Sequence, residues 1–419
     1  MPWTTITTMD QRAEFVQFAM SEQFTIAELC RRYHISRKTG YKWLERYRAE
    51  PAIDTPVDTT VSHAVLAHGS RSQFQDLSRR PKRSPLQVST ELEDRIVGLR
   101  RQHPFWGARK LRVLLREQLE QELGSHRSRI PLRKLPAVST VHQVLVRHGL
   151  ITAEATAAAT PYIRFEHPLP NALWQMDYKG HVGLLNGARC HPLTVLDDHS
   201  RFNVVLHAGK DERTLTVQNA LEQALRLYGL PHRMTMDNGS PWGSDGSHPI
   251  TPLTIWLMRL GIQVSHSRPY HPQTQGKDER FHRTLKREVL SNRSFLSFEE
   301  AQNVFDAWRD LYNYQRPHEA IGMQRPAQRY YPSPRSFPEV LPPIEYDERA
   351  EVRKVQDGGE VHFHGRIVRT HKALKGLPVA FLPTENDGCF LLQFIHTPLK
   401  VISLHEAPEG GLIEGLTGG

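Results

Sequence analysis

Three acidic side chains stand in short segments whose surroundings suit metal-assisted chemistry on phosphate esters. Asp177 lies in LWQMDYKG, Asp237 in MTMDNGS and Glu279 in RPYHPQTQGKDERFHRTLK. The first two lie at or near the ends of apolar runs typical of strands, and strand ends converge at one edge of a sheet. Carboxylates gathered there can hold two divalent cations that activate an attacking oxygen and stabilise a leaving one. Their oxygen ligands favour magnesium or manganese over zinc.

The third acid must be carried by a helix. Apolar residues recur with helical spacing over 274–290, at Phe281, Leu285 and Val289. A second, polar stripe contains Glu279, His282, Arg283 and Lys286. Lys286 follows Glu279 by two helical turns and is therefore placed to bind a DNA phosphate beside the metal site, as is Arg283 on the same stripe. A lone acid is usually a solvated charge or a helix cap, but three in these contexts favour a site.

Other polar clusters fit structural roles better. The pair Asp197 and Asp198 in DDHSR reads as a strand end and turn rather than as metal ligands. The alternating histidines of HFH, at 362–364, share one face of a strand, but no further ligand accompanies them. We expect them to be exposed or satisfied within the core.

The acids require an α/β domain to position them. Over 161–335 we expect strands around 173–179, 191–198, 202–208, 233–237 and 262–266, which would form a mixed five-stranded sheet. Helices are expected around 214–228, 251–260, 274–290 and 298–315. After this domain, alternating apolar residues with DGG and NDG turns predict a small SH3-like β-barrel over 345–410.

Two helical regions precede this domain. Residues 1–50 predict a helix-turn-helix, in which Ser36 caps a last helix packed through Leu44 and Tyr47. Its candidate DNA contacts are Arg37, Lys38, Thr39 and Lys42. A linker over 51–85 leads to a second helix-turn-helix over 86–155, whose first helix would open with a capping box of Thr90 and Glu93. There the candidate DNA contacts are Thr140, Gln143 and Arg147, with the basic loop SHRSRIPLRK near the phosphates.

Composition agrees with a polyanionic partner. The chain has 419 residues, with 54 Lys and Arg against 45 Asp and Glu, a net charge of +9. This excess favours nucleic acid but does not establish it. Three widely separated cysteines exclude a local cysteine zinc site and disfavour a disulfide framework. No apolar segment predicts a signal peptide or a membrane span, so we expect a cytoplasmic, nucleoid-associated protein.

The acidic segments, with TVLDDHSRFNV and YNYQRPHEAIGMQRPAQRY, resemble the DDE-type transposases of bacterial insertion sequences. That family is related to retroviral integrases and is built on the ribonuclease H fold. The resemblance covers about 170–330 and implies that Asp177, Asp237 and Glu279 bind two Mg²⁺ or Mn²⁺ ions. Two features depart from the family. The spacing from Asp237 to Glu279 (279 − 237 = 42) is long, which suggests a surface-loop insertion at 240–251, and helix-turn-helix units replace the integrase zinc module.

The resemblance implies a transposase that binds the terminal repeats of its element. It would hydrolyse the phosphodiester at the element end and join the freed 3′-hydroxyl to target DNA. Holding two ends implies a homo-oligomer, while an accessory ATPase is left open. Two alternatives remain: a DNA-binding regulator whose core only acts as a scaffold, and a ribonuclease-H-like nuclease without strand transfer.

Overall fold

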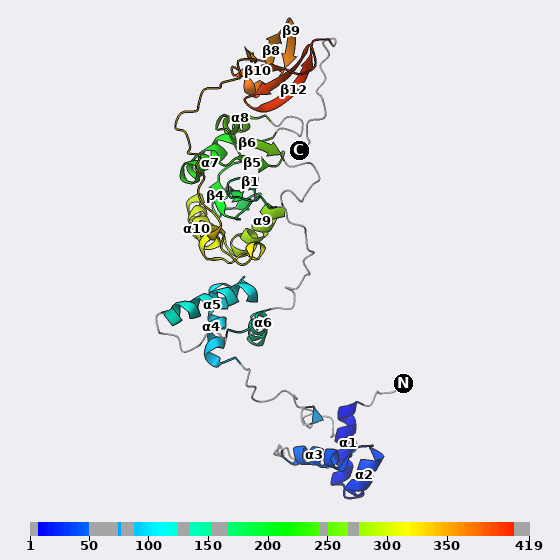
Figure 1. Ribbon diagram of the computed structural model, residues 1–419. Coiled ribbons are helices and arrows are strands. Elements are labelled where there is room, and N and C mark those ends of the chain that lie inside the picture. The colour runs from blue at the N-terminus through cyan, green and yellow to red at the C-terminus, as the bar shows by residue number, and fades with distance from the viewer. Residues whose placement is uncertain are drawn as a thin grey trace. The chain divides into compact units, whose positions relative to one another are not determined.

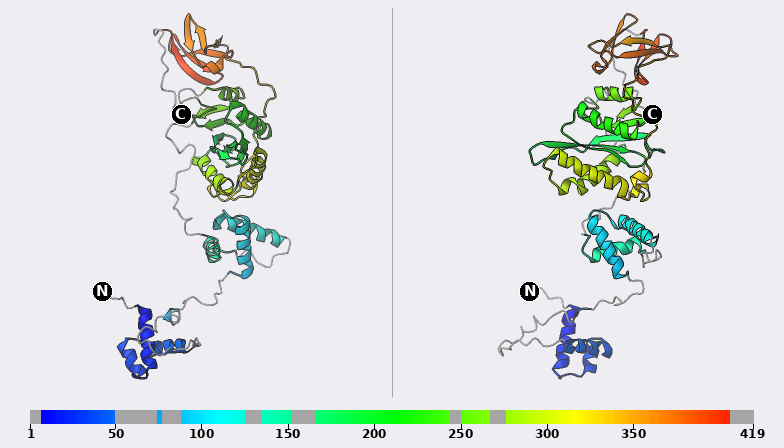
Figure 2. Two further views of the ribbon diagram at one scale, coloured as in Figure 1. Left: turned by 180° about the vertical axis from the view of Figure 1, so that it is seen from behind. Right: turned by 90° about the vertical axis from the view of Figure 1, so that its left-hand side faces the viewer.

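The chain contains two compact units, residues 1–87 and 88–419. The computed structural model describes residues 7–49, 74–76, 88–124, 135–151, 166–243, 250–266 and 276–405 (Figures 1 and 2). Within these ranges no helix is long and apolar enough to cross a membrane. The basic loop predicted at 125–134 lies outside the described residues.

The first unit is a three-helix bundle, as predicted. Its helices are α1 (Thr8–Met20), α2 (Ile26–Arg32) and α3 (Arg37–Ala49). Ser36 accepts a hydrogen bond from the Thr39 main-chain N–H at 3.1 Å, so it caps α3 as expected. The bundle core contains Phe15, Val16, Leu29, Cys30, Trp43 and Leu44. The prediction for Tyr47 was wrong, because Tyr47 is 44% exposed and Trp43 takes the inward position.

A short part of the predicted linker contacts this bundle. The main-chain oxygen of Phe74 accepts a hydrogen bond from Arg12 at 2.6 Å, and that of Gln75 accepts one from Arg46 at 3.1 Å. Arg12 also pairs with Asp76 at 3.1 Å. Residues 74–76 therefore belong to the packed structure of the first unit.

The second unit begins with three further helices, α4 (Thr90–Gln102), α5 (Ala108–Gly124) and α6 (Val138–Arg147). The predicted cap is displaced by one residue, because Ser89, not Thr90, accepts from the Leu92 main-chain N–H. The helices share one apolar cluster that includes Ile96, Leu115 and Leu145. The apolar residues of these helices recur with the helical spacing from which the helices were predicted.

A mixed sheet follows, with all five expected strands present. They are β1 (Leu173–Tyr178), β3 (Arg189–Asp197), β4 (Asn203–Gly209), β5 (Arg233–Met236) and β6 (Gln263–His266), with a two-residue β2 (Val182–Gly183) beside β3. The main strand order is β4-β3-β1-β5-β6. Strand β3 runs antiparallel to β1 and β4, whereas β5 and β6 run parallel to β1 and β5 respectively. Strands β1 and β5 thus end at the same edge.

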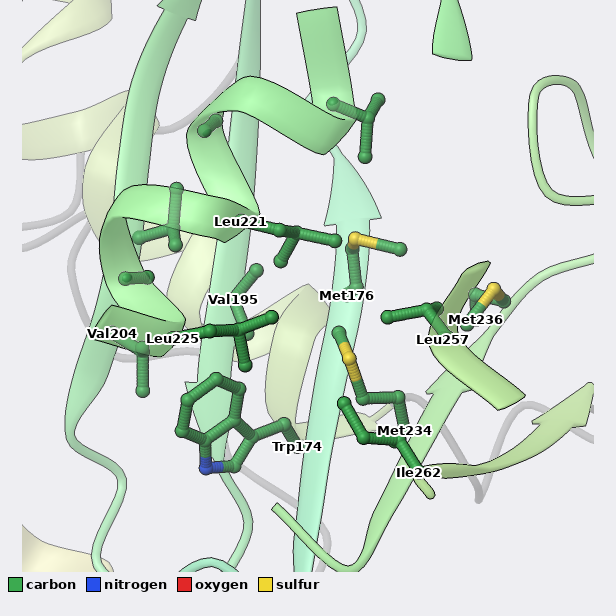
Figure 3. Close-up of a cluster of buried hydrophobic side chains, with 14 of the residues drawn as sticks. Trp174, Met176, Val195, Val204, Leu221, Leu225, Met234, Met236, Leu257 and Ile262 are labelled. Atoms are coloured by element: carbon green, nitrogen blue, oxygen red, sulfur yellow. The ribbon is translucent and has the colours of Figure 1, made fainter. Parts of the chain in front are cut away.

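Helices cover both faces of this sheet (Figure 2). On one face α7 (Thr214–Tyr228) and α8 (Pro252–Arg259) pack over Trp174, Met176 and Met234 (Figure 3). On the other, α9 (Gly276–Glu288) and α10 (Phe298–Asp310) bury Phe281, Leu285 and Phe305. A π-helical turn at Leu311–Gln315 extends α10 to the end predicted for it.

The C-terminal region forms two antiparallel sheets. One contains β7 (Glu351–Lys354), β10 (Pro378–Pro383), β11 (Cys389–Phe394) and β12 (Thr397–Ser403), and the other is the hairpin of β8 (Glu360–Phe363) and β9 (Arg366–Arg369). The expected closed barrel is not confirmed, because the strand pairing leaves the four-stranded sheet open at β12 and β7. The DGG and NDG turns are confirmed, with Gly359 and Gly388 at positive φ.

Candidate functional site

Strand alternation separates the candidate carboxylates from the core beneath them. Met176 and Met236 are fully buried in the cluster under α7 and α8 (Figure 3). Successive side chains of a strand point to opposite faces, so Asp177 lies on the face toward α9. Gln175 pairs with Thr235 in the parallel β1–β5 ladder. Asp177 and Asp237 each follow that pair by two residues, which brings them to neighbouring positions at the same edge.

Asp177 is electrostatically coupled to both other acids. Burial raises its pKa to about 7, with smaller contributions from the nearby charges of Asp237 and Glu279, while the Tyr178 N–H and Lys179 act in the opposite direction. Like charges disfavour the ionised form of a carboxyl group. The charges of Asp237 and Glu279 therefore repel that of Asp177, and a bound cation would reduce this repulsion.

Asp237 is held by hydrogen bonds to one of its two oxygens. Oδ1 accepts from the Gly239 main-chain N–H at 2.9 Å and from the Trp242 indole N–H. Trp242 is 1% exposed and stacks on Tyr178 at 5.2 Å between ring centroids. The prediction of a surface loop at 240–251 is wrong for Trp242, because its ring fills a core position beside the sheet. Residues 244–249 of the suggested insertion lie outside the described structure.

We expect Trp242→Phe to weaken divalent-metal binding by roughly 10-fold or more, the usual effect of removing a group that orients a metal ligand. The phenyl ring keeps the stacking on Tyr178 but cannot donate to Asp237. Titration with Mn²⁺, followed by electron paramagnetic resonance, measures this affinity. An unchanged affinity would show that Trp242 only fills space.

Glu279 lies in the first turn of α9, where its side chain is exposed. Arg283 and Lys286 are exposed at helical spacing from it, and the predicted apolar stripe of Phe281, Leu285 and Val289 is buried. The expected placement of Lys286 two turns from Glu279 thus agrees with the fold. His282 departs from it, because its ring is 7% exposed and turned into the protein.

The pair Asp197 and Asp198 is structural, as expected. Asp197 accepts main-chain hydrogen bonds from Asn171 and Ser200, each at 2.7 Å. Asp198 accepts from Gln175 at 2.8 Å and pairs with Lys277. Because Lys277 begins the helix that carries Glu279, this buried ion pair ties the start of α9 to the sheet.

Two further groups near Asp177 were not predicted. His282 lies with Nδ1 3.7 Å from Asp177 Oδ2 and Nε2 2.8 Å from Thr194 Oγ1. Burial, with the charge of Lys179, lowers the pKa of His282 to about 4, so the ring is neutral at pH 7. Contacts across 88 residues of chain leave no periodic signal in a sequence.

Asp278 is the second unpredicted group. It is 1% exposed, and neither of its carboxyl oxygens has a hydrogen-bond partner among the described residues. Burial, then repulsion from Asp177 and Asp198, raises its pKa well above the usual range, although Lys277 and Arg201 act against this. Asp278 directly precedes Glu279, so the sequence could have drawn attention to a second acid at the start of the helix.

The donor set fits a hard cation in its chemistry. Asp177, Asp237 and Glu279 offer carboxylate oxygens, the ligands that Mg²⁺ and Mn²⁺ prefer. Across the described ranges, no three His, Cys, Asp or Glu side chains are already spaced to hold a metal ion. The acids are thus near enough to repel one another but do not form a closed cage.

The candidate DNA contacts of the first unit lie on one helix. Arg37, Lys38 and Lys42 are exposed on α3, whereas Thr39 is half-buried and bonds to Ser36. Lys42 also lies 4.6 Å from the Trp43 ring centroid. An exposed basic face on the last helix is typical of groove-binding helix-turn-helix domains.

In the second helical region the candidates differ in their surroundings. Gln143 is exposed on α6, and Thr140 is half-buried. Arg147 pairs with Glu93, which also lies 3.4 Å from His148. Exposed ion pairs contribute at most about 1 kcal/mol, so this pairing would not prevent Arg147 from binding a phosphate.

Comparison with known proteins finds three regions that match protein families. Residues 167–272 and 260–326 match two families described as integrase core domains, and residues 11–50 match a helix-turn-helix domain. The first match contains Asp177 and Asp237, and the second contains Glu279. The α/β domain is therefore a ribonuclease-H-like integrase core preceded by a DNA-binding helix-turn-helix.

Two curated relatives are insertion-element proteins. A 39.2 kDa protein of insertion element IS476 from Xanthomonas euvesicatoria is 26% identical over 64% of this chain and 73% of its own length. A 31.7 kDa protein of IS407 from Burkholderia multivorans is 27% identical over 57% of this chain and 79% of its own length. Both matches extend over much more of the chain than the helix-turn-helix alone.

Among solved structures, the magnesium complex of the HTLV-2 integrase catalytic core is 18% identical, with a TM-score of 0.30, over 39% of this chain and 99% of that one. The integrase-core matches, the helix-turn-helix match and the insertion-element relatives agree with the order of the acidic segments. Residues 167–326 therefore form an integrase core, a helix-turn-helix domain lies near the N-terminus, and the chain is similar to proteins of insertion elements.

Proposed function

We propose that this protein is a transposase that hydrolyses the phosphodiester at the ends of its element and joins the freed 3′-hydroxyl to target DNA. Asp177, Asp237 and Glu279 would be the ligands of two Mg²⁺ or Mn²⁺ ions. When bound, the ions supply a polarised nucleophile and neutralise charge on the phosphate. The single observation that carries the proposal is the parallel register of β1 and β5, which brings Asp177 and Asp237 to neighbouring positions at one sheet edge.

Asp237 and Glu279 each have a support suited to this role. One oxygen of Asp237 accepts hydrogen bonds from Trp242 and Gly239, and the other has no partner shown among the described residues. Glu279 is exposed beside Arg283 and Lys286, whose cations would hold the DNA backbone near the acids. The ion pair of Lys277 and Asp198 fixes the start of α9, the helix that presents Glu279, Arg283 and Lys286.

The remaining regions would bring DNA to this site. We propose that the helical regions 1–50 and 86–155 bind the terminal inverted repeats. The core at 161–335 would carry out the reaction, and the sheets over 345–410 would contact DNA or another subunit. Arg37, Lys38, Thr39 and Lys42 would act in the first region, and Thr140, Gln143 and Arg147 in the second. Because one reaction needs two element ends, a homo-oligomer is the expected working form.

The test uses the full-length protein and a duplex that ends in the element's own terminal repeat. With Mg²⁺ we expect release of a 3′-hydroxyl at the element end and its joining to a second, labelled duplex. Asp237→Asn should reduce both products by about 100-fold or more, as loss of a group that stabilises the transition state does. Asp310→Asn makes the same chemical change at an exposed position at the end of α10 and should leave both products unchanged.

The alternatives predict other products. A regulator would bind the repeat without cutting it in Mg²⁺ or Mn²⁺, and a simple nuclease would cut without joining and without preference for element ends. Either result, obtained with folded protein, would overturn the proposal.

A further inference from the structure

Thr194 and His282 form a buried pair beside Asp177. Thr194 lies directly opposite Asp177 in the β1–β3 ladder and is 0% exposed. Its Oγ1 lies 3.0 Å from the Asp177 main-chain oxygen and 2.8 Å from His282 Nε2. The other ring nitrogen, Nδ1, lies 3.7 Å from Asp177 Oδ2.

The hydrogens in this cluster can be assigned by counting donors. A main-chain carbonyl can only accept, so the single hydroxyl hydrogen of Thr194 is donated to Asp177 O. His282 Nε2 must then carry a hydrogen and donate it to Thr194 Oγ1. A neutral imidazole has one N–H, which leaves Nδ1 with a bare lone pair. The 3.7 Å gap agrees, because a hydrogen bond from Nδ1 to Oδ2 would be shorter.

We propose that Thr194 keeps Asp177 open for a cation by holding His282 in the tautomer that cannot donate to the Asp177 carboxylate. Thr194 and His282 are thus positioning residues, and neither needs to touch DNA or metal. This inference rests on the proposed role of Asp177 as a metal ligand.

Removal of the threonine hydroxyl should reverse the effect. Without its acceptor, Nε2–H is left unsatisfied in a buried site, which is costly. The hydrogen then moves to Nδ1, where it can be donated to a charged carboxylate, a stronger bond than that to a hydroxyl. Asp177 would be partly satisfied by the protein itself and would bind a cation more weakly.

The experiment measures Mn²⁺ affinity of the full-length protein by electron paramagnetic resonance. Thr194→Val has nearly the shape of threonine and is expected to weaken binding by roughly 10-fold. Thr194→Ser keeps the hydroxyl and should bind as the natural chain does. Adding His282→Phe to Thr194→Val removes the unwanted donor and should restore most of the affinity. A packing role predicts the opposite, because the second substitution would add to the damage.

Each outcome decides the inference. Weakened binding by Thr194→Val that His282→Phe restores supports it. Equal affinity of Thr194→Val and the natural chain, or failure of His282→Phe to restore binding, overturns it. If Thr194→Val does not fold, Thr194→Ala carries the same expectations. If the natural chain shows no Asp237-dependent Mn²⁺ binding, that result would instead contradict the proposed metal site itself.

Discussion

Asp177→Asn is expected to stabilise the metal-free protein at pH 8 while abolishing its chemistry. The pKa of Asp177 is raised from 3.8 to about 7, so the ionised form is disfavoured in the folded state. At about 1.4 kcal/mol per pKa unit, ionisation costs the fold at most about 4 kcal/mol. Asparagine keeps the shape of the side chain without the charge and removes that cost.

The sign of the pH dependence follows from the raised pKa. A group with a higher pKa in the folded state contributes stability below its unfolded value, and this contribution is lost as pH rises. The metal-free natural chain should therefore lose stability as pH rises from about 4 to about 7. Asp177→Asn should not show the share of this loss that comes from ionisation of Asp177. Thermal unfolding in a chelator at pH 5 and pH 8 measures the difference. Identical pH slopes for the two proteins would contradict the prediction.

Mg²⁺ provides the matching control. A cation that binds only the folded state raises the unfolding temperature, and tighter binding raises it more. It should stabilise the natural chain more than Asp177→Asn, so the two proteins should approach one another as Mg²⁺ is added. The same acid would thus lower stability without metal and contribute to it with metal.

The elements that position the site could be predicted because their patterns are local. Helix α7 covers the predicted range 214–228, since its apolar residues repeat at helical spacing over four turns. Strands β1 and β5 were located within one residue by their apolar runs. The placement of Asp177 and Asp237 at one sheet edge followed from those strands alone.

What could not be predicted depends on contacts between distant segments. The burial of Trp242 required knowing that Tyr178 lies against it, and a Pro- and Gly-containing segment otherwise reads as an exposed loop. His282 directly follows Phe281 and lies outside the helical spacing of the apolar stripe, so the helix pattern alone assigned it to the polar face. The closed barrel is not confirmed, and the sequence could not decide it because alternation predicts strands but not which edges pair.

Asp278→Val is expected to raise the stability of the metal-free protein by about 1–3 kcal/mol at neutral pH, the usual cost of an unsatisfied buried polar group. Its carboxylate is fully buried without a hydrogen-bond partner among the described residues, and valine has a similar size. Burial raises the Asp278 pKa well above its usual range, so the gain should grow as pH rises. Asp278→Asn is the matched control, since it removes the charge but keeps a polar group.

The gain should also depend on Asp177. Each carboxylate raises the cost of ionising the other, because Asp177 contributes directly to the raised pKa of Asp278. The stabilisation in Asp177→Asn combined with Asp278→Val should therefore be smaller than the sum of the two single effects. Unfolding of the four proteins in a chelator at pH 8 gives this coupling. Strict additivity would show that the two acids do not interact and that Asp278 is buried for a reason unrelated to the candidate site.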